Sequence, residues 1–390
     1  IGHFFRFFVS KFWGPLYSNS NNFINSDDRA FHNWYRFVLS FPPHLVRDYI
    51  NDFGLDEHST VLDPFCGTGT TIVEAKLNQI SAVGLEANPF PYFASTVKTD
   101  WNISPDELQS FAAQVSESSY AELANQGIDD RALTCESKVD LRTLDKQAMQ
   151  AIIKNSISPL PLHKTLVLLE QINRYQSKSV HKYGVLALGN ALVSSIGNLR
   201  FGPEVGVGKI KKDAPVVAVW MHEIRKMVSD LKSVYGKNYP ETMVFLADAR
   251  EPAKIVKENS IDAVITSPPY PNEKDYTRTT RLESVVLGFF EDMSQLQGFK
   301  KTLLRSNTRG VYKSDNDDRW VTDVEEVQRL AAAIEARRLE LGKTSGFEKL
   351  YARVTRLYFG GMARHFSELT KILKPGAKLA YVTIGASFTS

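Results

Sequence analysis

Apolar residues along the chain follow two patterns: short bursts bounded by turns, and longer stretches with helical spacing. The first burst, at Val61 and Leu62, leads through a turn rich in glycine and threonine into a helix-compatible segment. A second short buried strand, SAVGLE, ends at Glu86. A strand, a helix and a strand in this order make a βαβ unit, which predicts a parallel sheet.

After Trp101 the pattern becomes polar and helical as far as about residue 240, with breaks at SISPLPLH and NLRFGPEVGVGKIKKDAP. This stretch is too long for a loop in a compact domain, so we interpret it as an inserted, mainly helical subdomain. The predicted division is an N-terminal segment with the first half of an α/β core at 1–101, the insertion at 102–239 and the second half of the core at 240–390.

The strand and helix alternation resumes at ETMVFLADARE, a predicted strand that ends in Asp248, and continues at SIDAVITSPPY, a strand that runs into a Pro-Pro turn. Residues 291–345 form a polar helical excursion, and a long helix follows. A turn and a fifth strand, KPGAKLAYVTIG, close the pattern. The predicted fold class is α/β, with a doubly wound, Rossmann-like sheet.

The amino-acid composition and net charge exclude several classes of protein. The 390 residues are 43% hydrophobic and 23% charged, which is ordinary globular composition and excludes disordered and collagen-like chains. The net charge of +3 gives no global basic field, so binding to nucleic acid requires a local patch. A run of about 18 apolar residues is absent from the sequence, so no membrane span is expected. Two cysteines, Cys66 and Cys135, cannot make a disulfide framework, and their scarcity fits a reducing cytosol.

The turn after the first predicted strand, DPFCGTGTT, is the first candidate site. Gly67 and Gly69 let the backbone turn tightly and approach a ligand, which suits a nucleotide-like cofactor. Glu86 ends the next strand about 20 residues further on, where a carboxylate can bind ribose hydroxyls. The alternatives are a tight connection from strand to helix and a solvated acid in a loop.

DPFCGTGTT, GLEANPF and TSPPY together resemble the S-adenosylmethionine-dependent amino-methyltransferases of DNA, which methylate exocyclic nitrogens. The resemblance implies a class I methyltransferase sheet, S-adenosyl-L-methionine as cofactor and DNA as partner. By this resemblance Asp63, Gly67 and Gly69 line the methionine side of the cofactor, Glu86 holds the ribose and Asp248 faces the adenine amino group. The cofactor-binding residues implied are Asp63, Pro64, Phe65, Gly67, Gly69, Thr70, Glu86 and Asp248.

A segment before the first strand, FHNWYRFVLSFPPHLVRDYI, resembles the N-terminal motif of the same family, which covers the methionine end. Phe41 and Pro42 join the cofactor-binding set on this ground. For Trp34, Tyr35 and Phe37 we favour hydrophobic packing of an N-terminal helix over contact with a ligand.

The predicted catalytic loop comprises Ser267, Pro268, Pro269 and Tyr270. An exocyclic amino group is a poor nucleophile because its lone pair is delocalised into the ring of the base. The Ser267 side chain and the Pro268 carbonyl can accept its hydrogens and favour a tetrahedral nitrogen, while the two prolines hold these acceptors in place. Tyr270 offers a ring face for a base flipped out of the duplex. The structural alternative is a proline-rich turn after a buried strand.

Other residues are candidates for contact with the substrate. Asn272, Asp275 and Tyr276 follow the catalytic loop, and Asp275 serves equally well as a helix cap. Two basic clusters are candidates for phosphate contacts, with a solvated face as the alternative. They are Lys209, Lys211 and Lys212, and Lys300, Lys301, Arg305 and Arg309.

Two rival chemistries are disfavoured. Methylation at cytosine carbon 5 needs a thiolate that attacks the base, and Cys66 sits inside the glycine loop, so we interpret it as a packing residue. His32, His44 and His163 are scattered without the spacing of metal ligands and are expected to be surface or capping histidines.

The motifs together favour a DNA amino-methyltransferase. Serine before Pro-Pro-Tyr favours cytosine N4, and adenine N6 is the close alternative. Three further alternatives are an RNA guanine N2-methyltransferase, a non-catalytic nucleic-acid-binding scaffold and a methyltransferase of small molecules or proteins. The resemblance also implies a bacterial or phage origin, a cytoplasmic location and a companion endonuclease or defence-system protein. The family core has seven strands and the sequence pattern predicts only five, so the final strands are expected to be missing from a truncated chain.

Overall fold

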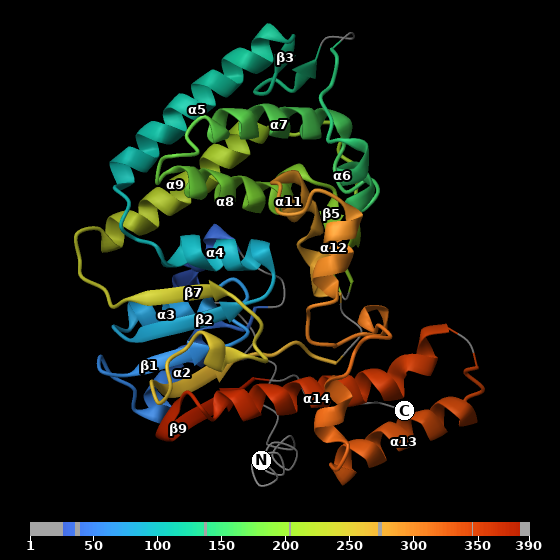
Figure 1. Ribbon diagram of the computed structural model, residues 1–390. Helices are drawn as coiled ribbons and strands as arrows, with labels where there is room; N and C mark the ends of the chain where they lie inside the picture. The colour runs from blue at the N-terminus through green and yellow to red at the C-terminus, as the bar shows by residue number, and fades with distance from the viewer. Residues whose placement is uncertain are drawn as a thin grey trace.

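A five-stranded parallel sheet in the order β7-β2-β1-β8-β9 forms the centre of the structure (Figure 1). The structure is a computed structural model, and it describes residues 26–35, 40–135, 139–202, 204–271, 275–344 and 346–382. The strands are β1 (Thr60–Asp63), β2 (Ser81–Glu86), β7 (Thr242–Leu246), β8 (Ile261–Thr266) and β9 (Leu373–Tyr381). All four neighbouring pairs are parallel, including β1 with β2 and β1 with β8. The five predicted strands and their parallel pairing are confirmed.

Helices cover both faces of this sheet. Neighbouring residues of a strand point to opposite faces, so Val61 of β1 packs with α2 (Pro43–Phe53) and α3 (Thr70–Leu77), while Leu62 packs with α14 (Tyr351–Leu369). Because both faces are buried, the strands are nearly continuous apolar runs, which makes them conspicuous in the sequence. This arrangement is the predicted doubly wound sheet.

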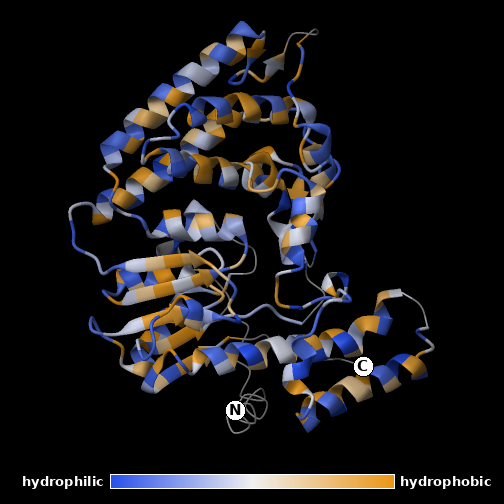
Figure 2. Cartoon of the chain, viewed as in Figure 1, coloured by the Kyte–Doolittle hydropathy of each residue, from blue (hydrophilic) through white to orange (hydrophobic). Residues whose placement is uncertain are grey.

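A layer of helices lies beyond α4 (Pro89–Thr99), between β2 and β7 in the chain (Figure 1). It consists of α5 (Pro105–Asn125), α6 (Lys146–Ala151), α7 (Pro159–Asn173), α8 (His181–Ala191) and α9 (Val216–Val234). The ribbons of α7 and α8 are largely apolar in Figure 2, and their buried side chains share one hydrophobic cluster with α4. In the part of the chain that the structure describes, no helix has the length and apolar character of a membrane span.

The breaks expected in this helical stretch have different structures. SISPLPLH is mainly the start of a helix, because Pro159 occupies the first helical position of α7, where a missing N–H costs nothing. The glycine-rich break after residue 198 contains a short antiparallel pair, β5 (Leu199–Arg200) with β6 (Gly206–Val207). A similar pair, β3 (Ile128–Asp129) with β4 (Thr134–Cys135), follows α5.

Trp34 and Tyr35 pack in the interior as expected, but the helix predicted for these two residues is wrong. Trp34 and Tyr35 are buried, and His32–Trp34 form only a single 3-10 turn. The Trp34 indole N–H donates to Asp230 of α9 at 2.8 Å, which ties this segment to the helical layer. Phe37 lies outside the described residues.

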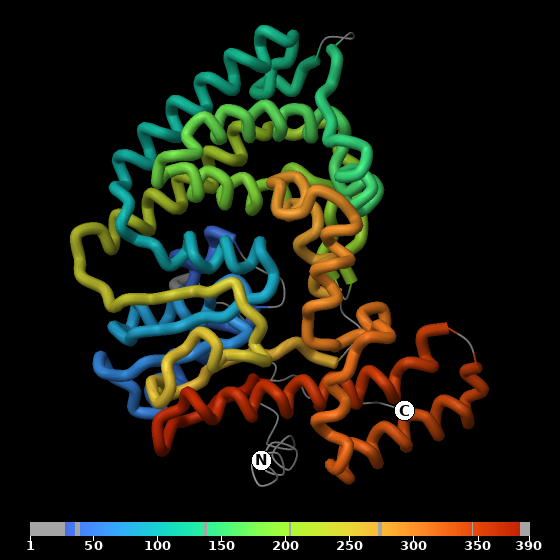
Figure 3. Tube along the Cα trace, viewed as in Figure 1, coloured from blue at the N-terminus to red at the C-terminus, as the bar shows by residue number. Residues whose placement is uncertain are grey.

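The chain between β8 and β9 makes a long excursion that returns to the sheet through α14 (Figure 3). Its helices are α10 (Tyr276–Thr279), α11 (Arg281–Val286), α12 (Met293–Lys300) and α13 (Glu325–Glu340), with the 3-10 segment η7 (Asp317–Val321) between the last two. The helices expected within 291–345 and for the long segment after it are confirmed as α13 and α14.

Two adjacent glycines in the middle of α14 allow the excursion to dock. A Cβ at Gly360 would lie 2.0 Å from the Asp317 carbonyl oxygen, and one at Gly361 would lie 2.2 Å from Leu304 Cδ1. Glycine inside a helix costs about 1 kcal/mol relative to alanine, so close packing against η7 is the compensating feature. We call Gly360 and Gly361 the glycine notch.

Gly360→Ala should lower the free energy of unfolding by about 1–3 kcal/mol, because the added methyl group collides with backbone. Gly298→Ala is the matched control, since Gly298 is an exposed helical glycine and a Cβ added there would have nothing within 4 Å. The control should be neutral or up to about 1 kcal/mol more stable. Urea unfolding of both variants measures the difference, and equal stabilities would show that the notch is not tightly packed.

Candidate active site

A cleft opens at the carboxyl ends of β1, β2, β7 and β8. Its cavity volume is about 190 Å³. β2 and β8 pair with opposite edges of β1, so the order of the strands reverses at β1. In doubly wound folds, ligands usually bind at the carboxyl ends of the strands where the order reverses, and the loop after β1 lies there. Of the cofactor-binding residues predicted, those that line this cleft are Phe41, Pro64, Phe65, Gly67, Thr70, Glu86 and Asp248.

The glycine loop has the conformation expected of it. Gly67 and Gly69 have φ values of 53° and 83°, a region that favours glycine. A Cβ at Gly69 would lie 2.9 Å from Ser95 Cβ of α4, so this glycine permits close packing of loop and helix. Gly67 lines the cleft, and a Cβ added there would have nothing within 4 Å.

Glu86 is built into the loop rather than solvated. Its carboxylate accepts hydrogen bonds from the backbone N–H groups of Gly67 at 2.9 Å and Asn88 at 2.7 Å. Burial raises the pKa of Glu86 to about 7, although these two hydrogen bonds oppose the shift. The alternative of a solvated loop acid is therefore wrong.

Asp63 lies beneath the loop and outside the cleft lining. Its Oδ1 accepts hydrogen bonds from the Thr266 hydroxyl at 2.6 Å and the Phe65 N–H at 3.1 Å. Its buried Oδ2 makes no hydrogen bond within the described part of the chain, and burial raises the pKa of this carboxyl to about 6. Gly69 and Pro42 also lie outside the lining of the cleft.

The four residues of the predicted catalytic loop all line the cleft, far from the glycine loop in sequence but beside it in space. The hydroxyl groups of Ser267 and Tyr270 are 2.9 Å apart, and the Tyr270 N–H donates to the Tyr276 hydroxyl at 3.0 Å. Burial raises the pKa of Tyr276 to about 12 and that of Tyr270 above its ordinary value, so both phenols stay neutral at physiological pH.

Asp275 has the capping geometry given as its alternative role. Its Oδ1 accepts the Thr277 N–H at 3.1 Å at the start of α10, and its Oδ2 binds Lys300 at 2.5 Å. Burial alone would raise the pKa of Asp275, but Lys300 and Thr277 hold it below its ordinary value. Asp275 and Tyr276 line the cleft, whereas Asn272 lies outside the described residues.

The basic residues predicted to contact phosphates occupy different positions. Lys211 and Lys212 do not line the cleft, and the Lys211 ammonium donates to the carbonyl oxygens of Ser195 and Gly197 at 2.5 and 2.6 Å. Lys212 is exposed. Arg305 lines the cleft but is only 5% exposed, so the alternative of a solvated face is wrong for this residue.

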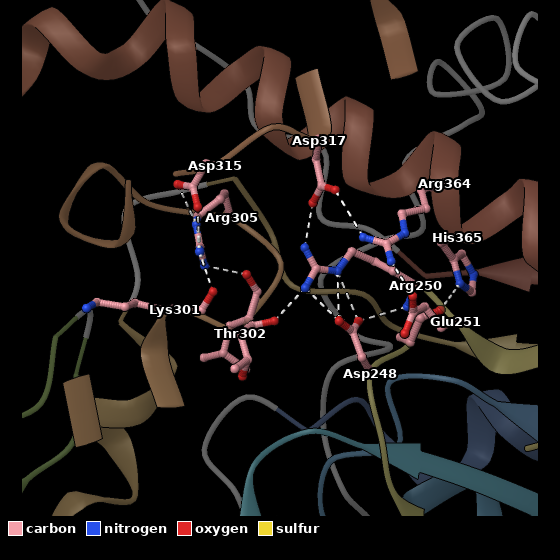
Figure 4. A network of polar contacts seen from close by, with 12 residues as sticks. Asp248, Arg250, Glu251, Lys301, Thr302, Arg305, Asp315, Asp317, Arg364 and His365 are labelled. Carbon is pink, nitrogen blue, oxygen red and sulfur yellow. Dashed lines mark hydrogen bonds and ion pairs between the residues drawn. The ribbon is translucent and has the colours of Figure 1, made fainter. Parts of the chain in front are cut away.

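The Arg305 guanidinium is held inside the excursion. It binds both carboxylate oxygens of Asp315 at 2.8 and 2.7 Å and donates to the carbonyl oxygens of Lys300 and Lys301 (Figure 4). The charge run identifies this arginine, but it does not identify its partner, which lies ten residues further along.

Two expectations about other residue types have opposite outcomes. Cys66 is buried and burial raises the pKa of its thiol, which confirms its assignment to packing. Histidines are expected at the surface or as caps, and a surface position is wrong for His32 and His163, which are buried and hydrogen bonded to Glu74 and Gln126. Among the described residues, no group of three or more His, Cys, Asp or Glu side chains could hold a metal ion.

Sequence patterns miss two residues that hold the backbone of the cleft lining in place. Lys98 is buried in α4 and donates to the Thr68 carbonyl at 2.8 Å, and burial lowers its pKa to about 7. His365 of α14 hydrogen bonds the Ala249 carbonyl at 2.5 Å beside the cleft. Neither lies in a recognisable motif, because each acts through a backbone carbonyl that only the fold brings near.

A parallel sheet with a glycine loop at its carboxyl edge is consistent with a Rossmann-like methyltransferase. Comparisons with known proteins agree. Residues 8–94 match the model of a family described as DNA methylase. The type II methyltransferase M.BsoBI of Geobacillus stearothermophilus is 26% identical over 389 residues, which cover 91% of this chain and 74% of that protein.

Two further relatives are type II methyltransferases named M.AvaI, from Nostoc sp. (strain PCC 7120 / SAG 25.82 / UTEX 2576) and Anabaena variabilis. Each is 21% identical over 374 residues, covering 90% of this chain and 73% of the relative. These similarities support an amino-methyltransferase, in agreement with the resemblance of the motifs.

A buried acid of α11 generates a pH-dependent prediction. Tyr35 donates to Glu283 Oε1 at 2.5 Å, and burial raises the pKa of Glu283 to about 8. Between about pH 4.5 and 8 the unfolded state releases this proton and the folded state keeps it, so Glu283 makes stability fall as pH rises through this window. Glu283→Gln removes this slope and keeps an acceptor for Tyr35.

The expected result is that the stability of Glu283→Gln relative to the wild type improves between pH 5.5 and 8. Urea unfolding at both pH values measures it. Glu117→Gln, at an exposed position of α5, is the control and should show a constant difference. A constant difference for Glu283→Gln as well would mean that the carboxyl is ionised in the folded protein.

Proposed function

We propose that this protein is a DNA methyltransferase that transfers a methyl group from S-adenosyl-L-methionine to the exocyclic amino group of a flipped base, with cytosine N4 as the target. The observation that carries the proposal is that one cleft gathers three separate motifs. The glycine loop contributes Gly67, the end of β2 contributes Glu86, and the loop after β8 contributes Ser267 to Tyr270. A tight turn alone does not require such a convergence.

The residues of the cleft fit the cofactor. Gly67 lines the cleft and leaves open space beside its Cα, and the cleft is lined by apolar groups that include Phe41, Phe65 and Leu85. Glu86 keeps lone pairs for the ribose hydroxyls. The buried carboxyl of Asp63, whose Oδ2 makes no hydrogen bond within the described residues, lies beneath the glycine loop and outside the cleft lining. When bound, the cofactor supplies a methyl group activated on a sulfonium.

The loop after β8 would prepare the amino group. Ser267 can donate its hydroxyl hydrogen to Tyr270, which leaves both serine lone pairs for the hydrogens of the base. The Pro268 carbonyl is a second acceptor, and the Tyr270 N–H bond to Tyr276 holds the loop in place. Because these acceptors need little reorganisation, they favour the tetrahedral nitrogen that attacks. The ring of Tyr270 stacks on the base.

Serine at position 267 is the residue that favours cytosine N4 over adenine N6. The name of each relative, a type II methyltransferase, supports a role in restriction and modification. A companion endonuclease or defence-system protein as partner and a cytoplasmic location are proposed from the resemblance of the motifs. Exposed Lys212, Lys301 and Arg309 are the proposed phosphate contacts. Arg305 is left out of this set because its guanidinium is already engaged with Asp315.

The deciding experiment incubates the protein with unmethylated DNA and labelled S-adenosylmethionine and identifies the product by nucleoside mass spectrometry. N4-methylcytosine is expected, and Tyr270→Ala should abolish it. N6-methyladenine would replace the target base and keep the mechanism. Methylation of transfer RNA guanine alone, or an unchanged product level in Tyr270→Ala, would overturn the proposal.

The raised pKa of Glu86 predicts how cofactor binding depends on pH. A carboxylate accepts the ribose hydroxyls better than a neutral carboxyl group does, and with a pKa of about 7 this group gains its charge between pH 6 and 8. Affinity for S-adenosylmethionine should therefore increase over this range. Glu86→Gln should bind more weakly and lose this component of the pH dependence, as measured by calorimetry. Glu258→Gln, at an exposed position, should match the wild type, and an unaltered profile in Glu86→Gln would remove Glu86 from the site.

A further inference from the structure

We propose that Arg250 is a positioning residue that couples the cofactor side of the cleft to the wall formed by residues 300–310. The inference rests on the proposed function, because it assigns Asp248 to the cofactor. Arg250 itself does not line the cleft. It acts through the groups that it holds on either side.

The first contact of Arg250 is with Asp248, at the end of β7. Its Nε donates to both carboxylate oxygens at 3.0 Å, its Nη2 donates to Oδ2 at 2.6 Å, and its backbone N–H donates to Oδ1 at 2.9 Å. The Asp248 side chain is still 32% exposed and lines the cleft. Arg250 therefore fixes the direction of a carboxylate without covering it.

The second set of contacts reaches the excursion. Nη1 of Arg250 binds Asp317 Oδ2 at 2.5 Å, and Nη2 donates to the Thr302 carbonyl at 2.5 Å (Figure 4). Every nitrogen of the guanidinium thus has a partner, and these partners come from β7 on one side and from the excursion on the other. The planar guanidinium of arginine can donate to partners on both sides at once, whereas the single ammonium of lysine cannot bridge the same set of acceptors.

The excursion in turn forms one wall of the cleft. Leu303, Leu304, Ser306 and Gly310 line it, together with Arg305. This wall has its own internal support, because Arg305 binds Asp315 and the carbonyl oxygens of its own turn. Its attachment to the cofactor side at Asp248 runs through Arg250.

The glycine notch gives this link a rigid base. The backbone of Asp317 packs on Gly360 of α14. Asp317 Oδ1 also lies 3.4 Å from Nη1 of Arg364, which is in α14 as well. Arg364 also binds Glu251, the residue after Arg250 (Figure 4). Two arginines and two acids thus fasten the turn after β7, η7 and α14 to one another. A movement of Asp248 toward a ligand is transmitted to Thr302 and Asp317, so cofactor binding and the shape of the wall are coupled.

The test compares Arg250→Lys, Asp317→Asn and the double variant with Lys254→Ala. Lys254 is exposed, pairs with Glu251 on the same turn and does not line the cleft, so it controls for loss of a nearby cation. Calorimetry should give a dissociation constant for S-adenosylmethionine raised about fivefold or more in both single variants. The double variant should be no weaker than the weaker single variant, because the two residues act as one unit.

Hydrogen exchange of the whole protein supplies a readout that requires no turnover. Without ligand, amides of residues 300–317 should exchange faster in Arg250→Lys and Asp317→Asn than in the wild type. Saturating S-adenosylmethionine should slow this exchange in the wild type and less so in Asp317→Asn. In methylation assays the KM for S-adenosylmethionine should rise more than kcat falls, since Arg250 touches no reacting atom.

Unchanged affinity in Asp317→Asn, additive effects in the double variant, or equal effects in Lys254→Ala would each overturn the coupling. Absence of cofactor binding by the wild type would overturn both the coupling and the proposed function. Coupled binding without any methylated nucleoside would leave the coupling standing and overturn only the proposed function.

Discussion

Parallel pairing of β1 with its two neighbours is the constraint on which the site depends. Strands that run in the same direction end at the same edge, so the residues after β1, β2, β7 and β8 meet although they are up to about 200 positions apart in the chain. A shift of one residue in this register would turn Val61 and Leu62 to the wrong faces and would also move Asp63 from beneath the glycine loop. The same apolar alternation therefore stabilises the core and aligns the site.

Among the described residues, two carboxyl groups at this edge of the sheet, Asp63 and Glu86, have no cation that offsets their burial. Burial raises the pKa of Asp63 to about 6 and of Glu86 to about 7, and it lowers the pKa of Lys98 to about 7. Each charged form is thus disfavoured mainly by loss of water rather than by a neighbouring charge of the same sign. A ligand that brings hydroxyl donors or positive charge into the cleft regains part of this cost, which is a property suited to a cofactor with a ribose and a sulfonium.

The strands, the glycine loop and the position of Glu86 were predictable because each depends on residues close together in sequence. Buried parallel strands leave continuous apolar runs, and a turn from strand to helix leaves glycines. The environments of Arg305 and Lys211 were not predictable, since a charge run is the same in a solvated face and in an interior network. Arg305 is buried in an ion pair with Asp315, which lies ten residues further along the chain. Lys211 donates hydrogen bonds to two carbonyl oxygens at the end of a helix.

The glycine notch shows what kind of signal a search for motifs overlooks. Adjacent glycines within an otherwise amphipathic helix conflict with local propensity, and such a conflict indicates a close approach by another part of the chain. Here the approaching part is η7, which carries Asp317. Because Asp317 is in turn bound to Arg250, the helix that covers one face of the sheet also supports a wall of the cleft. The excursion is therefore part of the structure that forms the site. The glycine pair in the sequence reflects the close packing of the excursion against α14.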